Sequence, residues 1–310
     1  MRKTPQIITV ILIAALFTST FLTYTTASEP LWGIDIGDTI NYDLNYVEID
    51  YSFPPVNYNA TGITFDNESS IIEEGSIVAF NATDINNTII EYDLIYNGTH
   101  EKNYRSATNF SDDISFLLNL PLKFALNETD IAGIKRVFTG LDYLVVPAVN
   151  DTWDEFDDYD NPLFLAITEE LFASQAEIDL EGKTTIDFAT DECIFDWFVN
   201  GTYLSVSNAT EFDFDYNLKM AYEISSGLLN GMRMLLDIEG ENNGVPTTLY
   251  ISSEVEKEGY DLAEFLLPSG DPDVDLNQLL SNLLPGFNWF LFPLAFIPIL
   301  LLELRRNKKK

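Results

Sequence analysis

Residues 212–224 read Phe-Asp-Phe-Asp-Tyr-Asn-Leu-Lys-Met-Ala-Tyr-Glu-Ile, an alternation in which every second side chain is large and apolar and those between are mostly polar. A period of two places the two sets of side chains on opposite faces of a β-strand. The stretch therefore predicts a long strand with one buried face and one face in water, and a sheet that is covered on one side only.

The residues after this strand predict a meander of hairpins. Ser226-Gly227 offers a turn, and the segment 240–244, Gly-Glu-Asn-Asn-Gly, offers a second. Between and after these turns lie two more alternating apolar sets, Met232, Met234, Leu236 and Ile238, and then Val245, Thr247, Leu249, Ile251 and Val255. Alternating runs separated by turns of this composition are typical of antiparallel strands.

The first half of the chain shows the same pattern with one irregularity. Apolar side chains alternate at Ile40, Tyr42, Leu44 and Tyr46, and then with the opposite parity at Val47, Ile49, Tyr51 and Phe53. A change of parity inside one strand predicts a β-bulge, because one extra residue moves the following side chains to the other face. Further strands are expected around residues 75–81, 88–96, 183–189, 194–199 and 203–207.

Two helical segments interrupt the strands. Asn161 and Pro162 are a favourable cap and first residue for a helix, with Phe164, Ile167, Leu171 and Phe172 on one side. The segment 111–126 is ambiguous because Pro121 would break it. We interpret the chain as a β-rich α+β fold, a curved antiparallel sheet partly covered by one or two helices, with two β-sandwich domains as the alternative. The acidic run 150–161 is the best place for a boundary between the halves 28–150 and 151–268.

Composition excludes several classes of protein. The 310 residues are 46% apolar and 13% aromatic, which is enough to fill a core and excludes wholesale disorder. A formal net charge of -34 repels phosphate backbones, so no nucleic-acid partner is expected. The single Cys193 and single His100 exclude an internal disulfide and a Cys/His zinc cage. We expect Cys193 to be buried in a strand and His100 to be exposed.

The N-terminus has the layout of a secretory signal. Met1-Arg2-Lys3 is followed by an apolar run over residues 7–22, and small residues precede a cleavage site after Ala27. Residues 1–27 are therefore predicted to be a signal peptide, with an uncleaved membrane helix as the alternative. The mature chain is then expected to start at Ser28.

The C-terminus predicts a membrane segment over residues 287–304, after a linker over 269–286. The basic tail 305–310 follows it directly, and basic flanks stay on the cytoplasmic side, so the main domain is expected outside the cell membrane. The apolar run 287–302 reaches only about 24 Å as a helix against a hydrocarbon core of about 30 Å. Pro293 and Pro298 weaken it further. A buried core helix at this end is the other alternative.

The tripeptide Pro285-Gly286-Phe287 stands directly before this run. Tripeptide, apolar run and basic cluster together resemble the PGF-type C-terminal sorting signal of archaeal cell-surface proteins, over about the last 26 residues. The resemblance implies that an intramembrane archaeosortase removes the tail and that a lipid holds the protein; a retained span is the alternative. The whole chain also looks like the choice-of-anchor surface proteins, which combine a shared ectodomain with exchangeable anchors.

Acceptor motifs for N-glycosylation are more frequent than composition explains. Roughly three N-x-[ST] motifs are expected by chance, and the chain has ten. Occupied sites must lie on solvated turns or strand edges, because glycans are bulky and hydrophilic. The alternative is an unmodified chain rich in Asn and Thr. The motifs begin at Asn59, Asn67, Asn81, Asn86, Asn97, Asn109, Asn127, Asn150, Asn200 and Asn208.

Calcium is the one metal that the acidic residues suggest. Asp271, Asp273 and Asp275 have the spacing that opens a calcium loop, but Leu276 stands at the position of the loop glycine. Asp275 is equally explained as the cap of a short Leu-rich helix. The denser candidate is the run within 151–160, with Asp154, Asp157, Asp158 and Asp160 as weak metal-ligand candidates. No other cofactor is expected.

These observations favour a glycosylated, surface-anchored extracellular protein with a structural or interaction role and no catalysis. Its expected partners are the membrane, through the C-terminal segment or a lipid, and possibly other surface proteins. One alternative is a carrier of a lipid or other apolar ligand, which needs an unfilled apolar cavity inside a half-barrel. A second alternative is an extracellular hydrolase, whose paired carboxylates the sequence does not locate.

Overall fold

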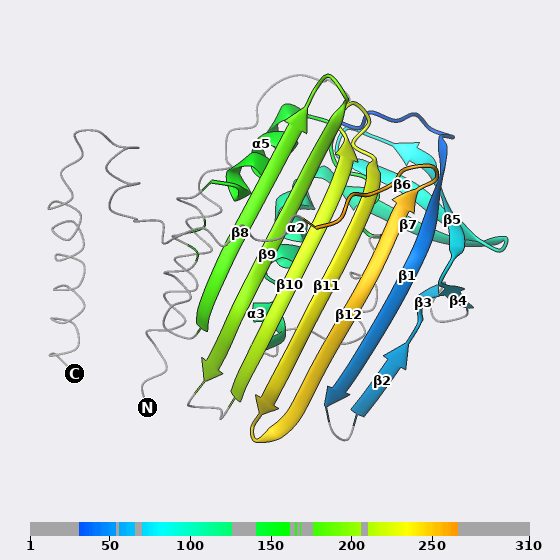
Figure 1. The fold of residues 1–310 in the computed structure, drawn as a ribbon. Coiled ribbons are helices and arrows are strands. Elements are labelled where there is room, and N and C mark those ends of the chain that lie inside the picture. Colours follow the sequence, from blue (N-terminus) through cyan, green and yellow to red (C-terminus); the bar gives the residue numbers. More distant parts are fainter. Residues whose placement is uncertain are drawn as a thin grey trace, which may run out of the picture.

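A large open antiparallel sheet dominates the computed structural model, which describes residues 31–53, 56–65, 70–125, 141–161, 165, 168, 176–205 and 210–265 (Figure 1). Nine strands follow one another across the sheet in the order β7-β6-β5-β1-β12-β11-β10-β9-β8, and a tenth, β2, pairs with β1. The sheet is curved, and its β5–β7 end turns towards the side that carries the helices (Figure 1). The expected β-rich α+β architecture is confirmed.

The strands of this sheet are β1 (Thr39–Phe53), β2 (Val56–Ala60), β5 (Ser76–Ile85), β6 (Ile89–Tyr96), β7 (Thr99–Ser106), β8 (Ala176–Asp187), β9 (Glu192–Ser205), β10 (Thr210–Glu223), β11 (Leu229–Asn242) and β12 (Val245–Lys257). β3 (Gly62–Phe65) and β4 (Ser70–Glu73) form a separate two-stranded pair. The helical elements are η1 (Ala107–Asn109), α2 (Phe110–Leu118), α3 (Leu120–Ala125) and α5 (Asn150–Tyr159).

The alternating residues from Phe212 onward form β10, and their apolar side chains are buried as predicted. Along β10 the alternation of buried and exposed positions is regular from Thr210 to Tyr216. The predicted turns are also confirmed, since Gly227 has a φ of 71°, and Asn243 and Gly244 have φ angles of 54° and 75°. Two residues with positive φ are what a tight hairpin turn between β11 and β12 requires.

The two halves of the chain meet in β1. The predicted bulge is present, because the register between β1 and β12 shifts between Leu44 and Tyr46. β1 pairs with β12 and, over its first residues, with β5 on its other side. The segments 28–150 and 151–268 therefore contribute to one sheet, and the alternative of two β-sandwich domains is wrong for the described residues.

Two expectations about local structure are wrong. Residues 194–199 and 203–205 belong to one strand, β9, because Gly201 does not break it, and residues 206–207 lie outside the described ranges. A Cβ at Gly201 would lie 2.2 Å from the carbonyl oxygen of Glu177, so this glycine allows close approach of β8. The acidic run 150–161, expected to hold the boundary between the two halves, is largely the helix α5, which buries Trp153 and Phe156.

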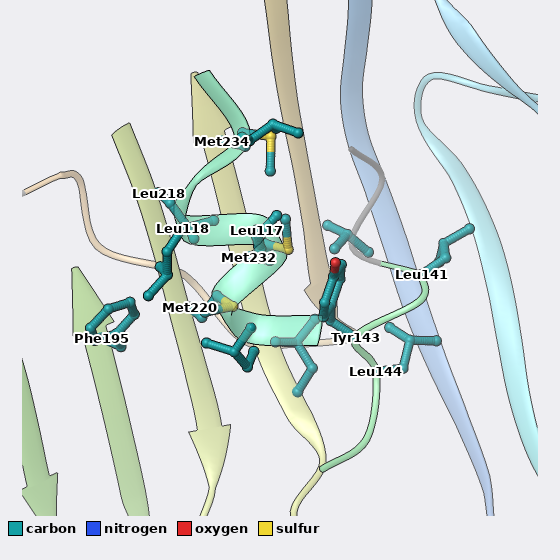
Figure 2. Close-up of a cluster of buried hydrophobic side chains, with 14 of the residues drawn as sticks. Leu117, Leu118, Leu141, Tyr143, Leu144, Phe195, Leu218, Met220, Met232 and Met234 are labelled. Carbon is teal, nitrogen blue, oxygen red and sulfur yellow. The ribbon is translucent and has the colours of Figure 1, made fainter. Parts of the chain in front are cut away.

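The helices cover the concave face of the sheet (Figure 1). The ambiguous segment 111–126 divides at Asn119 into α2 and α3, and Pro121 is tolerated because it stands in the first turn of α3. Figure 2 shows Leu117 and Leu118 of α2 packed over Met220 and Met232 of the sheet. The helix predicted from Pro162 lies largely outside the described residues.

Each edge strand of the sheet contacts a neighbouring element. At β8, the amide of Thr184 donates to Asp160 Oδ2 (3.1 Å) and its hydroxyl donates to the carbonyl of Phe156 (2.6 Å), so the end of α5 covers this edge. At β7, the guanidinium carbon of Arg105 lies 5.0 Å from the centroid of the buried Tyr143 ring. The same side chain forms an ion pair with Asp113 (3.1 Å). Covering elements and inward-pointing charges are two ways of blocking edge association.

Candidate functional site

The convex face of the sheet carries an acidic band at the end nearest the Asn243-Gly244 turn. Three cross-strand pairs between β10 and β11 bring like charges opposite each other: Glu211 and Glu241, Asp213 and Glu239, and Asp215 and Asp237. All members are exposed. We define the acidic band as these six residues together with two on β8, Glu177 and Asp179. Like charges directly opposite each other destabilise a sheet.

Replacing Asp215 with asparagine is expected to raise the free energy of unfolding at about pH 7, by about 0.2–1 kcal/mol for relief of one like-charge pair. Burial raises the pKa of Asp215, and Asp237 raises it further. A raised pKa in the folded state means that ionisation of Asp215 is less favourable there than in the unfolded chain. The free energy of unfolding therefore falls as the pH rises from the unfolded pKa, about 3.9, through the folded pKa. Urea unfolding should show the gain at about pH 7 and its loss at about pH 3.

Asp187→Asn is the control, because its expected change in the free energy of unfolding has the opposite sign. The backbone amide of Ala189 lowers the pKa of Asp187, and the hydroxyl of Thr190 adds to this effect. Stability from a lowered pKa is present above the unfolded pKa and is lost as pH falls through the folded pKa. This variant should therefore be less stable than the wild type at about pH 7. Equal effects of both substitutions would contradict the role of the like-charge pairs.

A second feature of the convex face is a C-terminal strap, residues 258–265, which follows β12 and crosses β11 and β10 (Figure 1). It begins where the amide of Glu258 donates to the carbonyl of Asn41 on β1 (2.9 Å). The hydroxyl of Tyr260 then donates to Glu192 Oε1 at the start of β9 (2.5 Å). The strap is thus attached to strands on both sides of its path.

Beneath the strap, four charged side chains form a clamp row, Glu254, Arg233, Lys219 and Asp196. Pairing of β12, β11, β10 and β9 places these residues directly opposite one another in this order. Lys219 is only 3% exposed and Arg233 9%, although both stand on the face that alternation assigns to water. Buried cations are costly unless they are paired and hydrogen-bonded.

Arg233 meets that requirement with acceptors from the sheet and from the strap. It forms an ion pair with Glu254 through Nε and with Glu264 through Nη1, the second at 2.8 Å. Its Nη2 donates to the carbonyl of Leu262 (3.3 Å), and Nη1 also reaches the carbonyl of Ala263 (3.5 Å). Arg233 therefore holds the strap mainly through backbone oxygens and one exposed carboxylate.

Lys219 repeats the arrangement one strand further on. Its Nζ lies 3.2 Å from Asp196 Oδ1 and donates to the carbonyl of Glu264 (3.1 Å). Three successive carbonyls of the strap, from residues 262 to 264, thus accept hydrogen bonds from two buried cations. Hydrogen bonds with a charged donor are stronger than neutral ones.

Leu262 fixes the strap by packing. It is 2% exposed and lies against Gly231, where an added Cβ would come within 3.3 Å of the Leu262 Cβ. The amide of Leu262 also donates to Glu256 Oε1 (2.6 Å). The glycine therefore leaves room on the convex face of β11 for one apolar side chain from the strap.

Sequence reasoning missed the clamp row. The alternation placed Lys219 correctly on the face opposite the core, which predicts a solvated lysine. The opposite charges of Asp196 and Glu254 lie on other strands, so their proximity depends on strand order and register. The local signal for the strap was weak, because Tyr260, Leu262 and Phe265 have neither strand nor helix periodicity.

The described glycosylation candidates lie at the surface. Asn97 stands in the β6–β7 turn with a φ of 49°, and Asn86 Oδ1 accepts the backbone amides of Thr88 and Ile89. Asn81 is half-buried on β5 and accepts from Thr39 (3.2 Å). Asn67, Asn127 and Asn208 lie outside the described residues, as does the sorting tripeptide at 285–287. The exposed candidates are Asn59, Asn86, Asn97, Asn109, Asn150 and Asn200.

Three candidate calcium ligands lie on α5 and the fourth, Asp160, follows its last residue. Asp154, Asp157 and Asp158 are exposed, while Asp160 accepts the Thr184 amide at the edge of β8. Burial, followed by the charges of Asp157 and Asp154, raises the pKa of Asp158. Within the described ranges no three His, Cys, Asp or Glu side chains are grouped to hold a metal ion. The Asp271–Asp275 candidate lies outside these ranges.

Cys193 and His100 point to opposite faces of the sheet. Cys193 is fully buried on β9, as predicted, and burial raises the pKa of its thiol to about 12. The side chain of His100 is 54% exposed, also as predicted, and lies 3.3 Å from Asp93. This placement does not form a thiol–imidazole pair.

Aromatic side chains of the helices and of the sheet pack against one another on the concave face. The ring of Phe156 on α5 packs against Phe195 and Tyr222, with centroid distances of 5.3 and 5.7 Å. The hydroxyl of Tyr222 donates to the carbonyl of Tyr143, and the hydroxyl of Tyr216 donates to that of Leu117, both at 3.0 Å. The hydroxyls of Tyr216 and Tyr222 thus bond to the elements that cover the sheet.

Comparison with known protein families, with curated proteins and with solved structures finds no match. Among the helices of the described ranges, none combines the length and the apolarity that crossing a bilayer requires. The predicted segment 287–304 lies outside these ranges.

Proposed function

We propose that this protein is a glycosylated, surface-anchored extracellular module with a structural or interaction role and no catalysis. The observation that carries the proposal is the strap, because it ties the last described residues of the chain to the sheet by charge-assisted hydrogen bonds and a buried leucine. A folded domain held so firmly up to Phe265 suits a chain whose next segments are a linker and an anchor. The membrane is its first partner, and other surface proteins are the second.

Three further features support the proposal. Six of the glycosylation candidates are exposed, as attachment of glycans to a folded chain requires. The exposed acidic band suits a solvated surface that resists non-specific association. A nucleophilic cysteine needs a lowered pKa, whereas burial raises the pKa of Cys193.

Intact-mass analysis of protein extracted from the native membrane tests the proposal. We expect a chain that starts at or near Ser28, carries glycans on at least half of the ten motifs and lacks the residues after the tripeptide at 285–287. Enzymatic or chemical deglycosylation should lower the mass in several steps. A soluble, unmodified chain that begins with Met1 would contradict the proposal.

The double substitution Gly286→Ala and Phe287→Ala separates the two forms of anchor. If the tail is removed, this variant should accumulate as an unprocessed form that keeps residues 305–310 in peptide mapping. The matched control is Asn288→Ala, next to the tripeptide, which should be processed like the wild type. Native protein that already retains residues 305–310 would identify a retained span as the anchor.

A further inference from the structure

We propose that glycans on Asn97 and Asn109 form a guard that keeps β7, an edge strand of the sheet, from pairing with a second copy of this chain. This role rests on the proposed function, because it requires that both motifs carry glycans. It adds the surface that the glycans protect and the partner that they exclude.

β7 is the last strand at its end of the sheet, and among the described strands it pairs with β6 alone, from Thr99 to Ser106. None of its eight residues is buried, and Tyr104 is 72% exposed. The contacts of Arg105 with the Tyr143 ring and with α2 lie near the end of the strand. A strand in this position offers backbone groups on its outer side to another strand.

The opposite edge strand of the sheet, β8, lies against the helix α5. The amide and the hydroxyl of Thr184 bond to the end of α5, and an added Cβ at Gly182 would lie 2.5 Å from the carbonyl oxygen of Tyr159. Ala176 and Leu180 of β8 are buried. The two edge strands therefore differ in how far other parts of the chain cover them.

Half of the exposed glycosylation motifs stand around β7. Asn97 lies in the turn between β6 and β7, and Asn109 ends η1, which follows β7 directly. Asn86 lies in the turn between β5 and β6. The amide of Ala107 donates to the carbonyl of Thr88 (2.8 Å), so this turn lies beside the end of β7. Both ends of the strand thus have an exposed acceptor asparagine.

The geometry of these asparagines suits a glycan. An N-linked glycan is attached to Nδ2, whereas Asn86 and Asn109 accept hydrogen bonds through Oδ1. Asn97 has a φ of 49°, which asparagine tolerates better than most residues. The eight residues of β7 extend over about 26 Å at about 3.3 Å per residue. Because glycans are bulky and hydrophilic, one at each end of this strand obstructs the approach of a second sheet.

Sedimentation velocity of the full chain, extracted from its native membrane in detergent, tests the guard. The double variant Thr99→Ala with Asn109→Gln removes both motifs, and it keeps Asn97 in its turn and the hydrogen bond of Ser111 to α5. We expect this variant to shift to at least twice the mass of the wild-type species. Hydrogen exchange should then show new protection of residues 99–106 in the associated protein.

The matched control is the double variant Asn150→Gln with Asn200→Gln. It also removes two exposed motifs, one at the start of α5 and one in β9, which has a strand on both sides. This control should sediment like the wild type. Adding Tyr104→Lys to the variant that lacks the guard should restore the wild-type mass, because a charge on an edge strand opposes pairing.

The guard would be overturned if its removal left the sedimentation unchanged, or if the control associated to the same extent. Association without protection of β7, or association that survives Tyr104→Lys, would also overturn it. Deglycosylation of the folded wild type, with the same expected shift, replaces the double variant should that variant fail to fold. Native protein with glycans elsewhere but not on Asn97 and Asn109 would refute the guard alone, whereas a chain without any glycan would contradict the proposed function.

Discussion

Phe156→Ala is expected to lower the free energy of unfolding by about 3–5 kcal/mol, the range for removing a buried aromatic side chain. Phe156 is fully buried and its ring contacts those of Phe110, Phe195 and Tyr222, so α5 would lose its main attachment to the sheet. Denaturant unfolding followed by circular dichroism measures the loss.

Phe188→Ala is the matched control for this substitution. Phe188 is 71% exposed, so the same truncation should change stability by no more than about 0.5 kcal/mol. Comparable losses at positions 156 and 188 would mean that α5 does not form part of the core.

Asp196→Ala is expected to be equally destabilising, by about 3–5 kcal/mol, because it leaves the buried Lys219 without its carboxylate. The double variant Lys219→Met with Asp196→Leu should recover most of the loss, since apolar replacements of a buried pair are often neutral. Measurement of the wild type, Lys219→Met alone, Asp196→Leu alone and the double variant gives the coupling energy between the two side chains.

An exposed ion pair is the control for the clamp row. His100→Ala removes a group that is 54% exposed beside Asp93, and exposed pairs contribute about 1 kcal/mol or less. If Asp196→Ala cost as little as His100→Ala, or if the double variant were no more stable than the single one, Lys219 would not be a buried, paired cation.

Some features of the fold follow from local sequence. The strand β10 and the bulge in β1 were predicted because a period of two reports which face of a strand each side chain occupies. Cys193 was placed in the core for a similar reason, since its neighbours are apolar and β-forming. The turn at Asn243-Gly244 was predicted because few residues adopt positive φ without strain.

Two errors had physical causes. Residues 194–199 and 203–207 were predicted to form separate strands, whereas β9 continues through Gly201, which permits close approach of β8. The run 150–161 was interpreted as the best place for a boundary between the two halves because acidic residues dominate it. Trp153, Phe156 and Tyr159 recur every three residues there, which is a helical spacing, and they bury one side of α5.

The sequence by itself determined that the chain builds an antiparallel sheet with one dry and one wet face, because alternation is a local property that any segment of strand carries. It also supplied the predictions of secretion, glycosylation and anchoring, which depend on short motifs. Only the tertiary structure decided that Glu254, Arg233, Lys219 and Asp196 form one row and that the strap closes over it. Strand order and register bring these charges together from four segments, and the burial that makes their pairing strong arises only when residues 260–265 cover them.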